Sequence, residues 1–171
     1  MINEKMEKAL NDQINAEYYS SYLYLSMAAH FEAINLKGFA NWMRVQAEEE
    51  MSHCMKIFDY VLERGGKVTL TAIDAPETSW ETPLAVYEQT AKHEAHVTAL
   101  VNELVDLAIE LSDHASNNFL QWFVAEQVEE EANVDEIVQQ LKLIDGNAHA
   151  IFMIDRELGS RVFVDDTGTS E

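Results

Sequence analysis

The sequence contains few residues that break helices or cross-link chains. Its 171 residues include 6 glycines, 2 prolines and a single cysteine, Cys54. Glycine and proline oppose an α-helix more strongly than any other residue, so their scarcity favours helical structure along the chain. One cysteine excludes an intrachain disulfide, which agrees with a reducing cytosol.

Basic residues are also scarce. The 11 lysines and arginines stand against 31 aspartates and glutamates, which leaves a net charge of −20. Nucleic-acid binding depends on basic surface, so we expect no nucleic-acid partner. The acidic excess has two interpretations: it serves solubility alone, or its negative field attracts cations.

Long apolar runs are absent from the sequence. No window reaches the roughly 18 unbroken apolar residues that a membrane span needs. The first five residues, MINEK, show neither the basic nor the apolar region of a signal peptide. We therefore expect a cytoplasmic protein without a membrane partner.

What remains is a series of helical segments separated by clear breaks. Gly65-Gly66 is a strong helix terminator, and Pro83 suits the first position of a helix. Asp113 is the expected N-cap of the helix that follows it. The predicted helices cover about residues 4–33, 39–64, 83–111, 113–144 and 148–158.

The connections between these segments predict the topology. Short turns join the first helix to the second and the third to the fourth, so each pair should be antiparallel. Residues 67–82 could span about 50 Å if extended, longer than a helix of about 40–45 Å. We predict an all-α fold, a four-helix bundle with one long crossover and a short fifth C-terminal helix. The expected domain covers residues 1–164, and residues 165–171 form a flexible polar tail.

Each long helix carries an apolar stripe that polar residues interrupt near its midpoint. Helix midpoints share one level in such a bundle, so the interrupting side chains should converge in the core. The interrupting residues are Glu17, Glu50, His53, Glu94, Gln127 and Glu130. For these residues to face solvent instead, the predicted inward face would have to be wrong on all four helices.

Four carboxylates buried at the same height in the bundle need positive charge to balance them. A buried, unpaired carboxylate is strongly disfavoured, and neighbouring ones repel each other. Two divalent cations would balance four glutamates. Oxygen ligands with one imidazole suit iron or manganese, although zinc could also bind. The Glu50-x-x-His53 spacing places two of these ligands on adjacent turns of one face.

Three stretches carry a family resemblance: QINAE at 13–17, AEEEMSH at 47–53 and FLQWFVAEQVEEE at 119–131. They look like the non-haem ferritins of bacteria and archaea, members of the ferritin-like di-iron superfamily. The resemblance extends over about residues 5–164. It implies a ferritin-like four-helix bundle with iron in its core.

The resemblance also implies roles for individual residues. The positions that match the two-iron centre are Glu17, Glu50, His53, Glu94, Glu130 and Gln127. In the family, the positions of Glu17, Glu50 and His53 hold one iron, and the position of Glu50 also bridges to the other iron. The positions that match a third iron, seen in some prokaryotic members, are Glu49, Glu126 and Glu129, with Glu130 shared.

Tyr24 matches the tyrosine that lies beside the centre in this family. Two interpretations stand side by side: an electron donor, and a core aromatic residue whose hydroxyl hydrogen-bonds to a ligand. Both can hold at once.

Two features bear on the subtype. The fourth helix offers Gln127-x-x-Glu130 where bacterioferritin has Glu-x-x-His, which argues against bacterioferritin. Met51 stands where bacterioferritin places its haem-binding methionine. A methionine that fills a buried or interfacial gap is the favoured interpretation, so haem is not expected. His93 and His96 fall off the stripe of Glu94 and are expected at a surface or interface.

The expected function is iron storage, with a ferroxidase that oxidises Fe²⁺ using O₂ or H₂O₂. The apolar fifth helix is too short to be stable alone. In ferritins it gathers at the four-fold axes of a shell, so a 24-subunit homo-oligomer is expected. One alternative is a rubrerythrin-type oxidase or peroxidase, which usually needs paired CxxC motifs that one cysteine excludes. The other is a metal-free structural bundle, which the buried carboxylates oppose.

Overall fold

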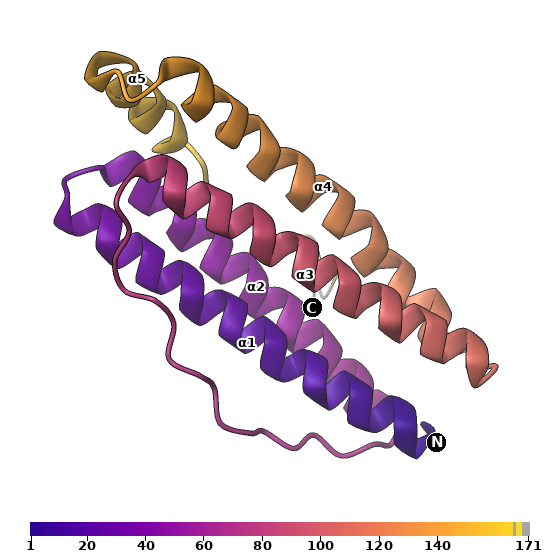
Figure 1. The fold of residues 1–171 in the computed structure, drawn as a ribbon. Helices are drawn as coiled ribbons and strands as arrows, with labels where there is room; N and C mark the ends of the chain where they lie inside the picture. The colour runs from indigo at the N-terminus through magenta and orange to yellow at the C-terminus, as the bar shows by residue number, and fades with distance from the viewer. Residues whose placement is uncertain (166, 169–171) are drawn as a thin grey trace.

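The protein folds into a bundle of four long helices capped by a short fifth one (Figure 1). The computed structural model describes residues 1–165, 167 and 168, and these contain no strand. The helices are α1 (Glu4–Ala33), α2 (Lys37–Glu63), α3 (Pro83–Glu110), α4 (His114–Ile144) and α5 (Ala148–Leu158). None of them has an apolar stretch long enough to cross a membrane. The predicted all-α bundle is confirmed.

The crossover between α2 and α3 runs along the outside of α1 (Figure 1). Side-chain amides of α1 hold it there: Asn11 donates to the carbonyl of Lys67 at 3.0 Å, and Asn15 donates to that of Ala72 at 3.0 Å. The connection therefore returns to the end of the bundle at which α2 began. α2 and α3 are parallel as a result, as the length of the connection predicts.

Polar side chains cap the starts of four helices. Asn3, Thr82, Asp113 and Asn147 each accept a backbone N–H in the first turn of the helix that follows. These bonds satisfy donors that a helix start leaves without partners. The exception is α2, which has no such bond from its own N-cap, Leu36.

The start of α2 is capped instead from the C-terminal helix. The Asp155 carboxylate in α5 accepts the backbone N–H groups of Gly38 at 2.8 Å and Phe39 at 3.1 Å. A Cβ on Gly38 would lie 1.5 Å from the Asp155 carbonyl oxygen. The sequence predicts that the second helix begins at about residue 39, whereas α2 begins at Lys37. Asp155 supplies the cap for this earlier start, which no local sequence pattern shows.

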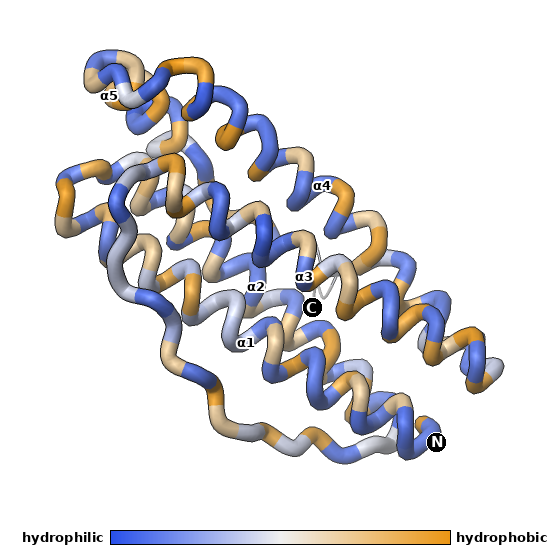
Figure 2. The backbone as a smooth tube through the Cα atoms, in the orientation of Figure 1, coloured by the Kyte–Doolittle hydropathy of each residue, from blue (hydrophilic) through white to orange (hydrophobic). Residues whose placement is uncertain are grey.

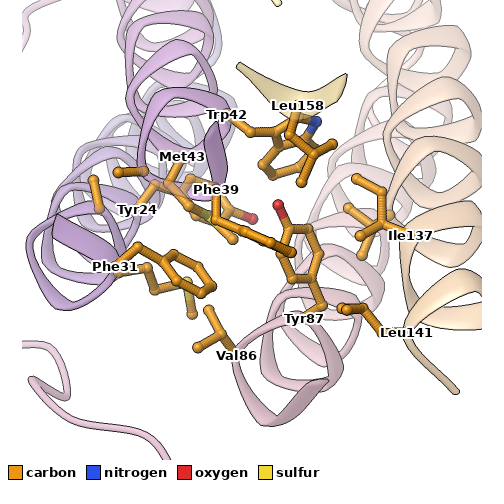
Figure 3. Close-up of a cluster of buried hydrophobic side chains, with 14 of the residues drawn as sticks. Tyr24, Phe31, Phe39, Trp42, Met43, Val86, Tyr87, Ile137, Leu141 and Leu158 are labelled. Atoms are coloured by element: carbon orange, nitrogen blue, oxygen red, sulfur yellow. The ribbon is translucent and has the colours of Figure 1, made fainter. Parts of the chain in front are cut away.

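Two hydrophobic clusters fill the bundle, one on each side of its middle. One contains Phe31, Phe39 and Tyr87, and the other contains Leu10, Ile57 and Leu120. Figure 3 shows the first cluster, where aromatic rings from α1, α2 and α3 point toward one another. Apolar and polar positions alternate along each helix (Figure 2). On every long helix, the predicted polar residues lie between its contributions to the two clusters.

The chain continues beyond α5 along the bundle. Residues 166 and 169–171 lie outside the described residues, so the flexible tail at 165–171 stays a prediction. Thr167, however, is only 4% exposed, and its carbonyl accepts a hydrogen bond from the Lys56 ammonium group.

The contact between Gly38 and Asp155 makes a testable prediction. Alanine favours a helix over glycine by about 1 kcal/mol, so Gly38→Ala should stabilise α2 if nothing lay above it. We expect it to lower the free energy of unfolding by roughly 1–3 kcal/mol instead, because the new methyl group displaces α5. Urea unfolding measures this. Gly159→Ala is the control, since its Cβ would meet its nearest atoms at 3.4 Å. Equal stability of the two variants would contradict the packing described here.

Candidate metal centre

The six predicted polar residues are all buried at the middle of the bundle. Glu17, Glu50 and His53 form a compact group, in which one ligand atom from each lies within 4.8 Å of the others. A Glu50 carboxylate oxygen is 3.8 Å from His53 Nδ1. The first group of ligands therefore comes entirely from α1 and α2.

The second group comes from α3 and α4. Gln127 donates its amide to a Glu94 carboxylate oxygen at 3.3 Å, and the Tyr24 hydroxyl donates to the other oxygen of Glu94. The charges of Glu94 and Glu130 both act on Glu50, where they add to burial in raising its pKa well above the ordinary value. Glu50 thus lies between the two groups.

Two carboxylate oxygens in this level lack a hydrogen-bond partner among the described residues. They are Oε2 of Glu17 and Oε2 of Glu130, each fully buried. Buried polar atoms in folded proteins almost always have a partner. One unsatisfied oxygen belongs to each group, so each group has a carboxylate oxygen left for a cation.

Burial leaves these carboxyl groups poorly suited to a negative charge. It is the largest cause that raises the pKa of Glu17 and of Glu94 above the ordinary range. Burial, with the charges of Glu94 and Glu49, raises the pKa of Glu130 to about 8. Near neutral pH the metal-free centre therefore holds protons that bound cations would replace.

Two glutamine amides support the centre, and the sequence interpretation gave them no role. Gln13 donates to Glu17 at 2.7 Å and Gln46 donates to Glu50 at 3.4 Å. Both amides lie four residues before the carboxylate that they contact, on the same helix face. That spacing was the available signal. By fixing the carboxylates, the amides hold the ligand oxygens ready for a cation.

Two of the three acids of the predicted third position lie near the centre. Glu126 has an oxygen 4.0 Å from His53 Nε2, and Glu49 is paired with Arg161 at 2.5 Å. Both are partly buried, whereas Glu129 is exposed. The structure brings Glu49 and Glu126 to the edge of the centre, and Glu129 stays in solvent.

The histidines of α3 differ from each other. His96 is exposed, as expected. His93 is partly buried: it lies 2.7 Å from the Ser20 hydroxyl and packs edge-on against the ring of Tyr24. Burial lowers its pKa to about 4, so its ring is neutral at physiological pH. The stripe pattern missed this contact because His93 faces α1 from beside the stripe.

Met51 is exposed, with 37% of its surface accessible. It is not buried within the single subunit, and the interfacial alternative stays a prediction. Cys54 is a buried free thiol whose pKa is raised to about 12, chiefly by burial. Such a thiol holds little of the thiolate form that reacts as a nucleophile.

Comparison with known proteins decides the family. The family model described as a ferritin-like domain matches residues 7–144. A bacterial non-heme ferritin of Bacteroides fragilis is 48% identical over 161 residues, which cover 94% of this chain and all of that protein. The chain belongs to the non-haem ferritins of bacteria and archaea.

Solved ferritin structures show the same architecture. An open-pore ferritin from the hyperthermophilic archaeon Archaeoglobus fulgidus is 54% identical, with a TM-score of 0.94 over 95% of this chain and all of that one. A form of the same ferritin, engineered to close it, is 55% identical with a TM-score of 0.95, over 96% of this chain and all of that one. The ferritin-like bundle with its short C-terminal helix is therefore shared by these proteins.

The raised pKa of Glu130 predicts how pH affects the chelator-treated protein. The unfolded chain releases this proton near pH 4.5 and the folded chain near pH 8. Between these values the folded state binds more protons, so the free energy of unfolding falls as pH rises. Glu130→Gln should flatten that dependence and stabilise the metal-free protein at pH 8 by roughly 1–3 kcal/mol.

Urea unfolding between about pH 5 and 9 measures the effect. Glu136→Gln is the matched control, because it removes an exposed charge from the same helix. If Glu130→Gln and the wild type keep the same slope against pH, the carboxyl of Glu130 does not hold a proton in the folded state.

Proposed function

We propose that the protein is an iron-storage ferritin that oxidises Fe²⁺ at a two-iron centre within each subunit. The observation that carries this proposal is the pair of unsatisfied buried oxygens on Glu17 and Glu130, one on each side of Glu50. Protons or hydrogen bonds could satisfy one such atom. Two of them, among four buried carboxylates and an imidazole, favour two cations as the missing partners.

The contacts support a division of the ligands. Glu17 and His53 serve the first iron, and Glu94 and Glu130 serve the second. Glu50 bridges the two, because its carboxylate belongs to the first group while the charges of the second group act on it. Gln127 donates to Glu94 and adds no charge. Its neutrality leaves the oxidised product less tightly held than a fifth carboxylate would.

Oxidation of the substrate iron follows from this ligand set. Each of two Fe²⁺ ions gives one electron to O₂, which takes up two protons and leaves as H₂O₂. If H₂O₂ is the oxidant, the same two electrons and two protons convert it to two molecules of water. Hard anionic oxygens stabilise Fe³⁺ over Fe²⁺, so the four carboxylates favour the oxidised state. Fe³⁺ then moves on to a mineral.

Tyr24 has a defined place in this scheme. Its hydroxyl donates to Glu94, and its ring packs against His93. The hydrogen bond holds Glu94 toward the second iron, which makes Tyr24 a positioning residue. The same contact places a phenol close enough to the centre to supply a further electron to the oxidant.

Storage requires a container that one subunit cannot provide. α5 packs Ile154 and Leu158 against its own bundle but exposes more than half of the surface of Phe152 and Met153. An apolar face of this kind favours burial against further copies. The relatives are described as ferritins. We therefore extend the proposal to a hollow homo-oligomer of 24 subunits, with α5 at its symmetry axes.

Loss of the first ligand group should abolish rapid iron oxidation. Glu50→Ala and His53→Ala are each expected to slow it by about 100-fold, since even outer partners of a metal site are worth 10–100-fold. Oxygen consumption and ferric absorbance after Fe²⁺ addition measure the rate. Glu48→Ala and His96→Ala are matched controls, because both residues are exposed. An untouched rapid phase in the ligand variants would refute the assignment.

The assembly has a separate test. Multi-angle light scattering over a range of salt concentrations should give the mass of 24 chains. After aerobic iron loading, electron microscopy should show dense cores inside hollow particles. A dimer at every salt concentration would exclude the shell, and so would mineral found only outside the particles.

A further inference from the structure

The segment that follows α5 lies along α2 and passes the level of the metal centre. The Asn41 amide donates to the carbonyls of Leu158 at 3.3 Å and Arg161 at 2.9 Å. Six residues further on, the carbonyl of Thr167 accepts from Lys56. The segment therefore runs parallel to α2 for about four helical turns. Figure 1 shows its yellow trace leaving α5 and turning back along the bundle. We refer to residues 159–165, 167 and 168 as the C-terminal strap.

Arg161 is the strap residue with the strongest hold on α2. Its guanidinium donates to Glu49 at 2.5 Å and to the side-chain oxygen of Gln46 at 2.8 Å. It also lies 4.5 Å from the centre of the Trp42 ring. Gln46 in turn donates to Glu50 at 3.4 Å. Arg161 is thus one side chain away from the proposed bridging carboxylate.

Glu49, the partner of Arg161, is one of the acids of the predicted third iron position. Glu49 and Glu126 lie at the edge of the centre, and the charge of Glu49 acts on Glu130. Glu130 also carries one of the two unsatisfied buried oxygens. A divalent cation that used Glu49 and Glu130 would lie next to the guanidinium of Arg161. Two positive groups repel each other at a partly buried site, so the guanidinium of Arg161 weakens the binding of a cation at Glu49.

We propose that Arg161 is a displaceable counter-ion that competes with a third divalent cation for Glu49, so that the C-terminal strap controls filling of this position. The proposal rests on the two-iron centre of the proposed function. While Arg161 holds Glu49, the first two cations bind tightly and the third binds weakly. When Arg161 withdraws, Glu49 is released to a cation on the outer side of the centre. The tether at Asn41 and the ring of Trp42 keep the arginine close enough to return.

Anaerobic calorimetric titration of the assembled protein with Co²⁺ tests this competition. The wild type should bind two equivalents tightly and a third weakly. Arg161→Gln should tighten the third by about tenfold, a usual size for coupling between two sites, and leave the first two unchanged. Arg161→Lys should tighten it less, because a lysine keeps the charge but loses the fork that reaches both Glu49 and Gln46.

Two further variants separate competition from other effects. Arg156→Gln removes an exposed arginine from the same end of the chain, so it makes the same change in net charge. It should titrate like the wild type. The double variant Glu49→Gln with Arg161→Gln should lose the gain, because the contested carboxylate is gone.

The outcomes divide cleanly. An unchanged third equivalent in Arg161→Gln overturns the proposal, and so does equal tightening in Arg156→Gln. A gain that persists in the double variant also overturns it. If Arg161→Gln does not assemble, Arg161→Lys decides: tightening of the third equivalent supports competition, and wild-type affinity refutes it. Failure of the two-iron centre would show separately, as loss of the two tight equivalents in the wild type.

Discussion

The crowding of four carboxylates at one buried level is the constraint on which the rest of the structure depends. Glu17, Glu50, Glu94 and Glu130 are all within the core, and burial raises the pKa of each. A helical bundle without a bound cation would be more stable with apolar residues at these positions. The two hydrophobic clusters lie on either side of the four carboxylates. Their packing offsets the unfavourable burial of these groups.

The sequence predicted the features that depend on periodicity and left out those that depend on distant contacts. The midpoint positions of Glu17 and Glu94 identify the centre, because helices of similar length align their middles. The length of residues 67–82 identifies the crossover. The packing of Asp155 on Gly38 was missed, since the two residues are 117 positions apart and no local pattern joins them. Arg161 was missed for the same reason: nothing in the sequence around it shows which helix it will contact.

The C-terminal part of the chain therefore does more than extend the bundle. Asp155 completes the start of α2, and Arg161 then reaches Glu49 and Gln46 in the middle of the same helix. α2 also supplies Glu50 and His53 to the metal centre. The cap from Asp155, the contacts of Arg161 and two of the candidate ligands thus all lie on one helix.

The crossover also has a consequence for how the chain reaches its native state. Short turns make α1–α2 and α3–α4 two local hairpins, and contacts close in sequence form faster than distant ones. Glu17, Glu50 and His53 all belong to the first hairpin, whereas Glu94, Gln127 and Glu130 belong to the second. The first hairpin by itself carries a three-ligand set, and the second set arrives only when the hairpins dock. A metal ion bound by the first hairpin would offer a nucleus on which the second hairpin docks. The stored ion would then assist the folding of the protein that stores it.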